Sequence, residues 1–129
     1  MVIDSSALIA ILEAEEEAEQ FVELIEQDPI RLISAVSVVE TTIVIKNRRG
    51  QRGVEALNLL LQKADVTIES VTAEHASAAC QAYHEYGKGR HPAKLNFGDC
   101  FSYAAAKLTE EPLLFKGNDF SRTDLKRCI

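Results

Sequence analysis

The chain has 129 residues and a net charge of −6, and 47% of its residues are hydrophobic and 26% charged. These values are typical of one globular domain with a substantial core, and we expect a single domain over residues 1–129. No apolar run approaches the roughly 20 residues of a membrane span. The first residues have no basic region and meet an acid at position 4, so we expect no signal peptide. The three cysteines form no Cys-x-x-Cys pair, which predicts neither a disulfide framework nor a zinc site and favours a reducing cytoplasm.

In chain order, hydrophobic periodicity and turn residues predict strands that alternate with helices. We expect strands near residues 1–3, 32–33, 66–71 and 113–115, with a possible fifth at 126–129. We expect helices at 5–12, from 18 towards Pro29, from 34 or 37 to 46, and at 54–63, 73–86 and 101–108. Gly50 and Gly53 fall in the connection before residue 54, and residues 87–92 form a loop. This order predicts an α/β fold with a central parallel sheet of four to five strands flanked by helices on both faces.

The negative charge is unevenly distributed along the chain. Residues 13–28 contain eight acids and no base, so the remainder has 12 acids and 14 bases, a charge of +2. A local basic field can attract a polyanion whatever the overall charge. The bases gather in two stretches, one with Lys46, Arg48, Arg49 and Arg52 and the other with Lys88, Arg90 and Lys94. Simple solvation of helix ends and loops is the alternative for each stretch.

Four acids stand where ligands bind in parallel sheets, beyond the carboxyl ends of the strands. Asp4 directly follows the first strand, Asp99 opens a helix that looks buried, and Asp119 follows the fourth strand. Glu40 is the only charged residue between positions 32 and 45, and a lone buried carboxylate costs several kcal/mol unless it is compensated. A bound cation would compensate it, and oxygen-rich sites suit Mg²⁺ or Mn²⁺.

Each acid also has a purely structural alternative. Asp4 would cap the helix that follows it, and Ser37-x-x-Glu40 matches a capping box. Asp99 would be a helix cap and Asp119 a turn residue. These roles do not exclude metal binding, because a capped helix start can still present its carboxylate to a cation.

Four segments carry a resemblance that extends from Asp4 to about Asp124. They are Met-Val-Ile-Asp4-Ser-Ser-Ala-Leu, Ser37-Val-Val-Glu40-Thr, Leu95-Asn-Phe-Gly-Asp99-Cys-Phe-Ser-Tyr-Ala and Leu113-Leu-Phe-Lys-Gly-Asn-Asp119-Phe. In motifs, order and spacing the chain resembles the PIN-domain ribonucleases, and within them the VapC toxins of type II toxin–antitoxin pairs. By this resemblance Asp4, Glu40 and Asp99 are acidic metal ligands and Asp119 is the fourth. Related chains often have two adjacent acids at the last position, where this chain has Asn118 before Asp119.

The resemblance implies a metal-dependent endoribonuclease that cuts structured RNA such as tRNA or rRNA, with Mg²⁺ or Mn²⁺ as cofactor. It also implies a homodimer, inhibition by a VapB-like antitoxin, and contact with DNA only through that antitoxin. In such a hydrolysis Asp4, Asp99 and Asp119 would hold one or two ions, and Glu40 would ligate through water or accept its proton. Ser5 or Ser6 would help to position a water, and the two basic stretches would bind the RNA phosphates.

Other interpretations of the acids fit less well. A haloacid-dehalogenase-type phosphatase needs a second acid two residues after Asp4, where this chain has Ser6. A receiver domain needs an acidic pair near its start and a phospho-acceptor aspartate after its third strand, and both are missing. A catalytically silent PIN fold that binds RNA or a partner is the remaining alternative, but the intact set of acids favours the enzyme.

Overall fold

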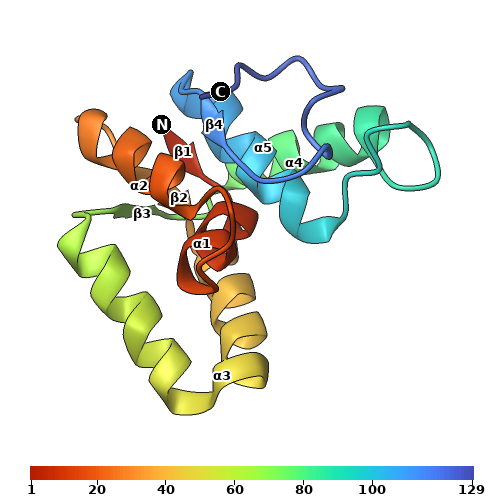
Figure 1. Cartoon of the computed structure of the whole chain (residues 1–129). Helices are drawn as coiled ribbons and strands as arrows, with labels where there is room; N and C mark the ends of the chain where they lie inside the picture. The colour runs from red at the N-terminus through yellow and green to blue at the C-terminus, as the bar shows by residue number, and fades with distance from the viewer.

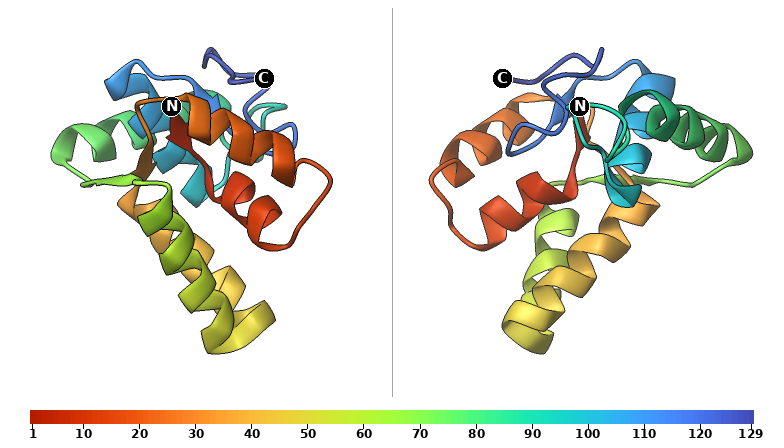
Figure 2. Two further views of the ribbon diagram at one scale, coloured as in Figure 1. Left: turned by 60° about the vertical axis from the view of Figure 1, so that its left-hand side comes forward. Right: turned by 90° about the vertical axis from the view of Figure 1, so that its right-hand side faces the viewer.

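Four short parallel strands form the centre of the computed structural model, which describes residues 1–129. The sheet has the order β3-β2-β1-β4, with β1 at Val2–Ile3, β2 at Leu32–Ser34, β3 at Thr67–Glu69 and β4 at Leu113–Leu114. The helices are α1 (Ser5–Leu12), α2 (Ala18–Gln27), α3 (Ala35–Lys63), α4 (Ala73–Tyr86) and α5 (Phe97–Thr109). Helices cover both faces of the sheet, so the predicted α/β architecture is confirmed (Figures 1 and 2). None of the helices combines the length and apolar character that crossing a bilayer requires.

The alternation of side chains in the strands builds two hydrophobic cores, one on each face of the sheet. In β1, Val2 joins the core under α4 and α5, whereas Ile3 joins the core under α1, α2 and the second arm of α3. Leu113 and Leu114 of β4 divide in the same way. All four side chains are fully buried, as expected for parallel strands that are covered on both faces.

The longest helix, α3, is folded into a hairpin with Gly50 at its tip (Figure 1). Gly50 has φ 65° and ψ −154°, a left-handed φ that glycine adopts without strain. Gly53 lies in the second arm, where a Cβ would come within 2.5 Å of Ile45 Cγ2, so the arms approach closely there. The predicted break at Gly50 is confirmed, but the prediction that Gly53 belongs to the connection is wrong.

Two further elements differ from the sequence expectation. Helix α5 begins at Phe97 rather than near Phe101, because Asn96 caps it. The tail at residues 126–129 adds only a single bridge between Leu113 and Arg127, not a full strand. The sheet therefore has four strands, the lower end of the predicted range.

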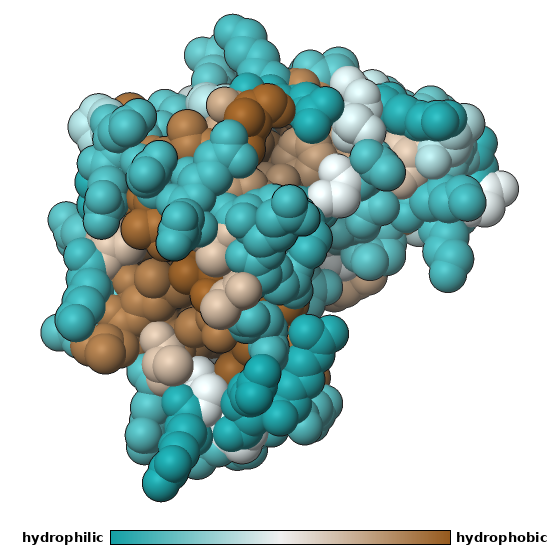
Figure 3. Space-filling model, in the orientation of Figure 1, coloured by the Kyte–Doolittle hydropathy of each residue, from teal (hydrophilic) through white to brown (hydrophobic).

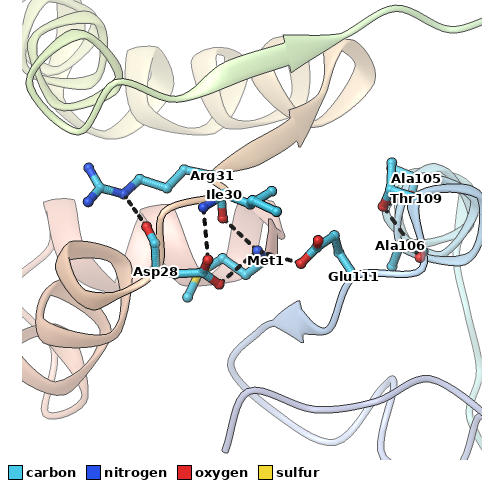
Figure 4. Close-up of polar contacts among 8 residues, drawn as sticks. All are labelled: Met1, Asp28, Ile30, Arg31, Ala105, Ala106, Thr109 and Glu111. Atoms are coloured by element: carbon cyan, nitrogen blue, oxygen red, sulfur yellow. Dashed lines mark hydrogen bonds and ion pairs between the residues drawn. The ribbon is translucent and has the colours of Figure 1, made fainter.

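Polar contacts around Met1 close the amino edge of the sheet (Figure 4). The ammonium group of Met1 donates to Asp28 Oδ2 at 2.9 Å, to the Ile30 carbonyl at 2.6 Å and to Glu111 Oε2 at 3.1 Å. Arg31 Nε donates to the Asp28 carbonyl at 2.8 Å. These bonds join the segments that precede β2 and β4, which leaves the opposite edge of the sheet for the acids that follow the strands.

Candidate active site

The four predicted acids come from four different elements and lie at the carboxyl edge of the sheet. Asp4 follows β1, and Glu40 lies in the second turn of α3, which starts directly after β2. Asp99 lies in the first turn of α5, and Asp119 lies in the loop after β4. Their charges act on one another, because Asp4, Asp119 and Glu40 each contribute to raising the pKa of Asp99. The structure therefore brings together the four acids that the sequence predicts.

Asp4 is only 2% exposed, and three hydrogen bonds hold its carboxylate. Its Oδ2 accepts from the Ser6 backbone N–H at 3.0 Å and from the Ser6 hydroxyl at 2.6 Å. Its Oδ1 accepts from the hydroxyl of Ser102, on α5, at 2.5 Å. Asp4 is therefore the cap of α1 that the sequence allowed, and it also carries a buried charge at the site.

Glu40 is half-buried, and its carboxylate lies against α5. The Ser5 hydroxyl donates to Glu40 Oε1 at 2.6 Å, and a Cβ at Gly98 would lie only 2.0 Å from Glu40 Oε2. The capping-box interpretation of Ser37 and Glu40 is wrong, because α3 begins earlier and Ser34 caps it. Two apolar neighbours of Glu40 on α3 are more than half exposed, so this carboxylate is less enclosed than the sequence suggested.

Asp99 is 7% exposed and completes a capping box at the start of α5. Its N–H donates to Asn96 Oδ1, and the Asn96 N–H donates to Asp99 Oδ2, both at 3.0 Å. Burial is the main cause that raises the pKa of Asp99, and the hydrogen bond from the Asn96 N–H opposes it. The charges of the other three acids raise the pKa further, to about 7. A pKa raised in this way is the expected result of burying a carboxyl group, and the three other acids nearby add to it.

Asp119 and Asp124 have different surroundings, although both follow β4. Burial and then the charge of Asp4 raise the pKa of Asp119. Burial would also raise the pKa of Asp124, but hydrogen bonds from Lys107 and Tyr103 outweigh it and lower that pKa. The Tyr103 hydroxyl donates to Asp124 Oδ1 at 2.6 Å. Asp119 thus belongs electrostatically to the acidic cluster, whereas Asp124 fastens the C-terminal segment to α5.

The acidic cluster has no basic partner within the chain. None of its four members forms an ion pair with a lysine or arginine. Lys116, three residues before Asp119, pairs instead with Glu15 and Glu17. Four neighbouring carboxylates without a base are a donor set that a hard divalent cation fits, since such cations prefer oxygen ligands.

Comparison with known proteins places this geometry in a family. The family model of the PIN domain matches residues 1–126. This chain belongs to the PIN domain family. Ribonuclease VapC30 of Mycobacterium tuberculosis (strain ATCC 25618 / H37Rv) is 53% identical over 97% of this chain and 95% of the relative. Ribonuclease VapC of Mycolicibacterium smegmatis (strain ATCC 700084 / mc(2)155) is 52% identical over 97% of each chain.

Solved structures share the PIN fold at lower sequence identity. The crystal structure of the Sarcin-Ricin loop cleaving toxin VapC20 of Mycobacterium tuberculosis has a TM-score of 0.79 at 20% identity, covering 96% of this chain and 95% of that one. VapBC2 from Rickettsia felis, bound to a DNA fragment from its promoter, has a TM-score of 0.75 at 15% identity, covering 98% and 94%. These likenesses confirm the predicted PIN fold.

The PIN site is open rather than a closed cage of ligands. No three or more His, Cys, Asp or Glu side chains are placed so that together they could hold a metal ion. Mg²⁺ needs fewer protein ligands than that, because it keeps several waters and is usually held by one or two carboxylates together with substrate phosphates. A bound divalent cation would supply Lewis-acid stabilisation of the charge on the phosphate oxygens and lower the pKa of water. The only hydrogen bond to the Glu40 carboxylate is at Oε1, so Oε2 has no hydrogen-bond partner within the chain.

The predicted phosphate-binding residues lie at two places around the PIN domain, and all seven are exposed. The first stretch surrounds the tip of the α3 hairpin, which projects from the body of the molecule, and the second lies in the α4–α5 loop (Figure 2). Lys46 is six residues beyond Glu40 on α3, about 9 Å further along the helix axis. Arg49 also forms an ion pair with Glu13 Oε2 at 2.5 Å, so part of its charge is already compensated.

Two residues of the site were missed by the sequence analysis. Gly98 leaves the space that the Glu40 carboxylate occupies, and Ser102 binds Asp4. A glycine in the first turn of a helix is a signal of close approach, because glycine weakens helices. Ser102 follows Asp99 by three residues, which places both on one face of α5. Both features are visible in the local sequence, but neither predicts which acid the residue contacts.

Proposed function

We propose that this chain is a metal-dependent endoribonuclease that acts in the cytoplasm as the toxin of a toxin–antitoxin pair. The observation that carries the proposal is a group of four acids, from four elements, without a basic partner. Relatives named as VapC ribonucleases, 52% and 53% identical over nearly the whole chain, support the reaction and the toxin role. The complete acidic set favours this function over a silent PIN fold that only binds RNA or a partner.

We further propose that Asp4, Asp99 and Asp119 hold one or two Mg²⁺ or Mn²⁺ ions. Glu40 would accept the proton of the attacking water. Glu40 Oε2 has no hydrogen-bond partner, which supports that role. The Glu40 carboxylate also lies against Gly98 of α5, the residue directly before Asp99. The substrate is structured RNA such as tRNA or rRNA. The exposed bases at the α3 tip and in the α4–α5 loop would bind its phosphates, because the acids alone would repel them.

Cleavage of RNA by the purified chain tests the proposal. Activity should require Mg²⁺ or Mn²⁺ and stop with chelator, and Asp99→Asn should lower the rate by orders of magnitude while the fold survives. Asp65→Asn is the matched control, because Asp65 is exposed and makes no side-chain hydrogen bond or ion pair. Unchanged cleavage by the Asp99 variant would show that the assigned site is wrong.

A VapB-like antitoxin is the partner that we propose for inhibition, and DNA would be contacted only through it. Two structural neighbours are toxin–antitoxin complexes, from Klebsiella pneumoniae and Rickettsia felis. A groove of about 410 Å³ lies between the end of α1 and the α3 hairpin, and a mainly apolar hollow of about 360 Å³ lies beside α2. Hydrophobic surface gathers between α1 and the α3 hairpin in Figure 3.

The antitoxin would place apolar side chains in this groove and a basic side chain among the carboxylates. Arginine suits that position, because it binds two carboxylate oxygens at once. Titration with the cognate partner should abolish cleavage, and full activity in the saturated complex would refute this mode of control.

A homodimer is the remaining part of the proposal. The largest hollow, about 660 Å³, lies between α4 and α5 and is mainly apolar, and Phe97 on its rim is 74% exposed. An exposed aromatic side chain beside an apolar groove is typical of a protein contact. Sedimentation should show a dimer for the wild type and a monomer for Phe97→Asp, whereas a dimeric variant would exclude this surface.

A further inference from the structure

We propose that Ser102, oriented by Ser37, is a positioning residue that fixes the orientation of the Asp4 carboxylate, whose Oδ1 would bind the divalent cation. The inference rests on the metal site proposed above and concerns a hydroxyl pair outside the four acids. Ser37 lies on α3 and Ser102 on α5, and neither side chain has any exposed surface. Their hydroxyl oxygens are 3.0 Å apart, and Ser102 Oγ is 2.5 Å from Asp4 Oδ1.

The direction of donation along this chain follows from the number of protons. Each serine hydroxyl has one proton to donate, and the carboxylate of Asp4 has none. Ser102 therefore donates to Asp4, and Ser37 must donate to Ser102 for the bond between the hydroxyls to form. A buried carboxylate at the end of two aligned hydroxyls is held in one orientation by helices α3 and α5 together.

The acceptor capacity of Asp4 identifies the oxygen that remains for a cation. A carboxylate has about four lone-pair positions, two on each oxygen. Oδ2 already accepts two hydrogen bonds from Ser6, whereas Oδ1 accepts only the one from Ser102. The free position is therefore on Oδ1, and the Ser102 hydroxyl determines where it points. Such orientation of a ligand by an outer hydrogen bond is common in metal sites.

Mn²⁺ binding, measured by calorimetry in the absence of RNA, tests the inference together with thermal unfolding of each variant. Ser102→Ala should weaken Mn²⁺ binding about tenfold or more, and Ser37→Ala should weaken it less. The double variant should match Ser102→Ala, because Ser37 acts only through Ser102. Thr109→Val is the control on α5, since it removes a hydroxyl that bonds only to backbone carbonyls and should leave Mn²⁺ binding unchanged.

Wild-type Mn²⁺ affinity in Ser102→Ala would overturn the positioning role, and so would a further loss on adding Ser37→Ala to that variant. If Ser102→Ala did not fold, Ser37→Ala would decide, and unchanged affinity in it would overturn the role. Failure of the proposed metal site would look different. In that case Asp4→Asn and Asp99→Asn would bind Mn²⁺ as the wild type does.

Discussion

The contact between Gly98 and Glu40 predicts that one substitution, Gly98→Ala, lowers activity without lowering stability. A Cβ at position 98 would lie 2.0 Å from Oε2, 2.6 Å from Cδ and 2.8 Å from Oε1 of Glu40. Contacts of a Cβ below 3.0 Å essentially never occur, so in Gly98→Ala the Glu40 carboxylate must move by about 1 Å or more. The moving atoms are the end of a flexible side chain, and we therefore expect the backbone to stay in place.

The size of the effect follows from this displacement. A misplacement of 1 Å at a reacting group can lower a rate by about 100-fold, and Glu40 is the proposed proton acceptor. Replacing glycine by alanine in a helix adds up to about 1 kcal/mol of stability, less near a helix end. Gly98→Ala should thus cleave RNA about 100-fold more slowly with an unchanged or higher melting temperature.

Single-turnover cleavage and thermal unfolding together measure both effects. The control is the same substitution in a Glu40→Ala background, where the clash no longer exists and Gly98→Ala should have no further effect on the rate. Wild-type cleavage by Gly98→Ala would refute the reasoning. A further loss of rate in the Glu40→Ala background would show that Gly98 acts through another contact.

Three further measurements test the site. Asp119→Asn should weaken Mn²⁺ binding about tenfold or more, whereas Asp124→Asn should lower the melting temperature and spare the metal; the reverse result would make Asp124 the fourth ligand. The pKa of Asp99 is raised to about 7 from 3.8, so the folded state keeps a proton that the unfolded chain loses. Its contribution to stability is therefore complete below about pH 4 and is lost as the pH rises through 7. Urea unfolding of the metal-free wild type should show this fall in the free energy of unfolding with pH, and Asp99→Asn should not show it. RNA affinity should fall steeply with salt concentration. Replacing Arg48 and Arg49 by alanine should reduce the slope of log affinity against log salt concentration by about 0.7–0.9 per lost phosphate contact. An unchanged slope would show that these two residues do not bind RNA phosphates.

The sequence alone determined the layers of the fold and predicted which acids form the site. Strand and helix periodicity are local properties, so the order of elements and the parallel sheet follow from them. Asp4 and Asp119 directly follow strands, and the carboxyl ends of parallel strands meet at one edge. Their proximity is therefore predictable from topology, without knowledge of any side-chain contact.

Only the tertiary structure decided which side chains serve these acids. Ser102 donates to Asp4 across 98 residues of sequence, and Gly98 makes room for Glu40, because α5 packs against β1 and α3. The local pattern at Ser37 pointed to a helix cap, but Ser34 takes that role and leaves Ser37 free to bond to Ser102. Contacts of this kind depend on how distant segments pack, and local sequence does not contain that information.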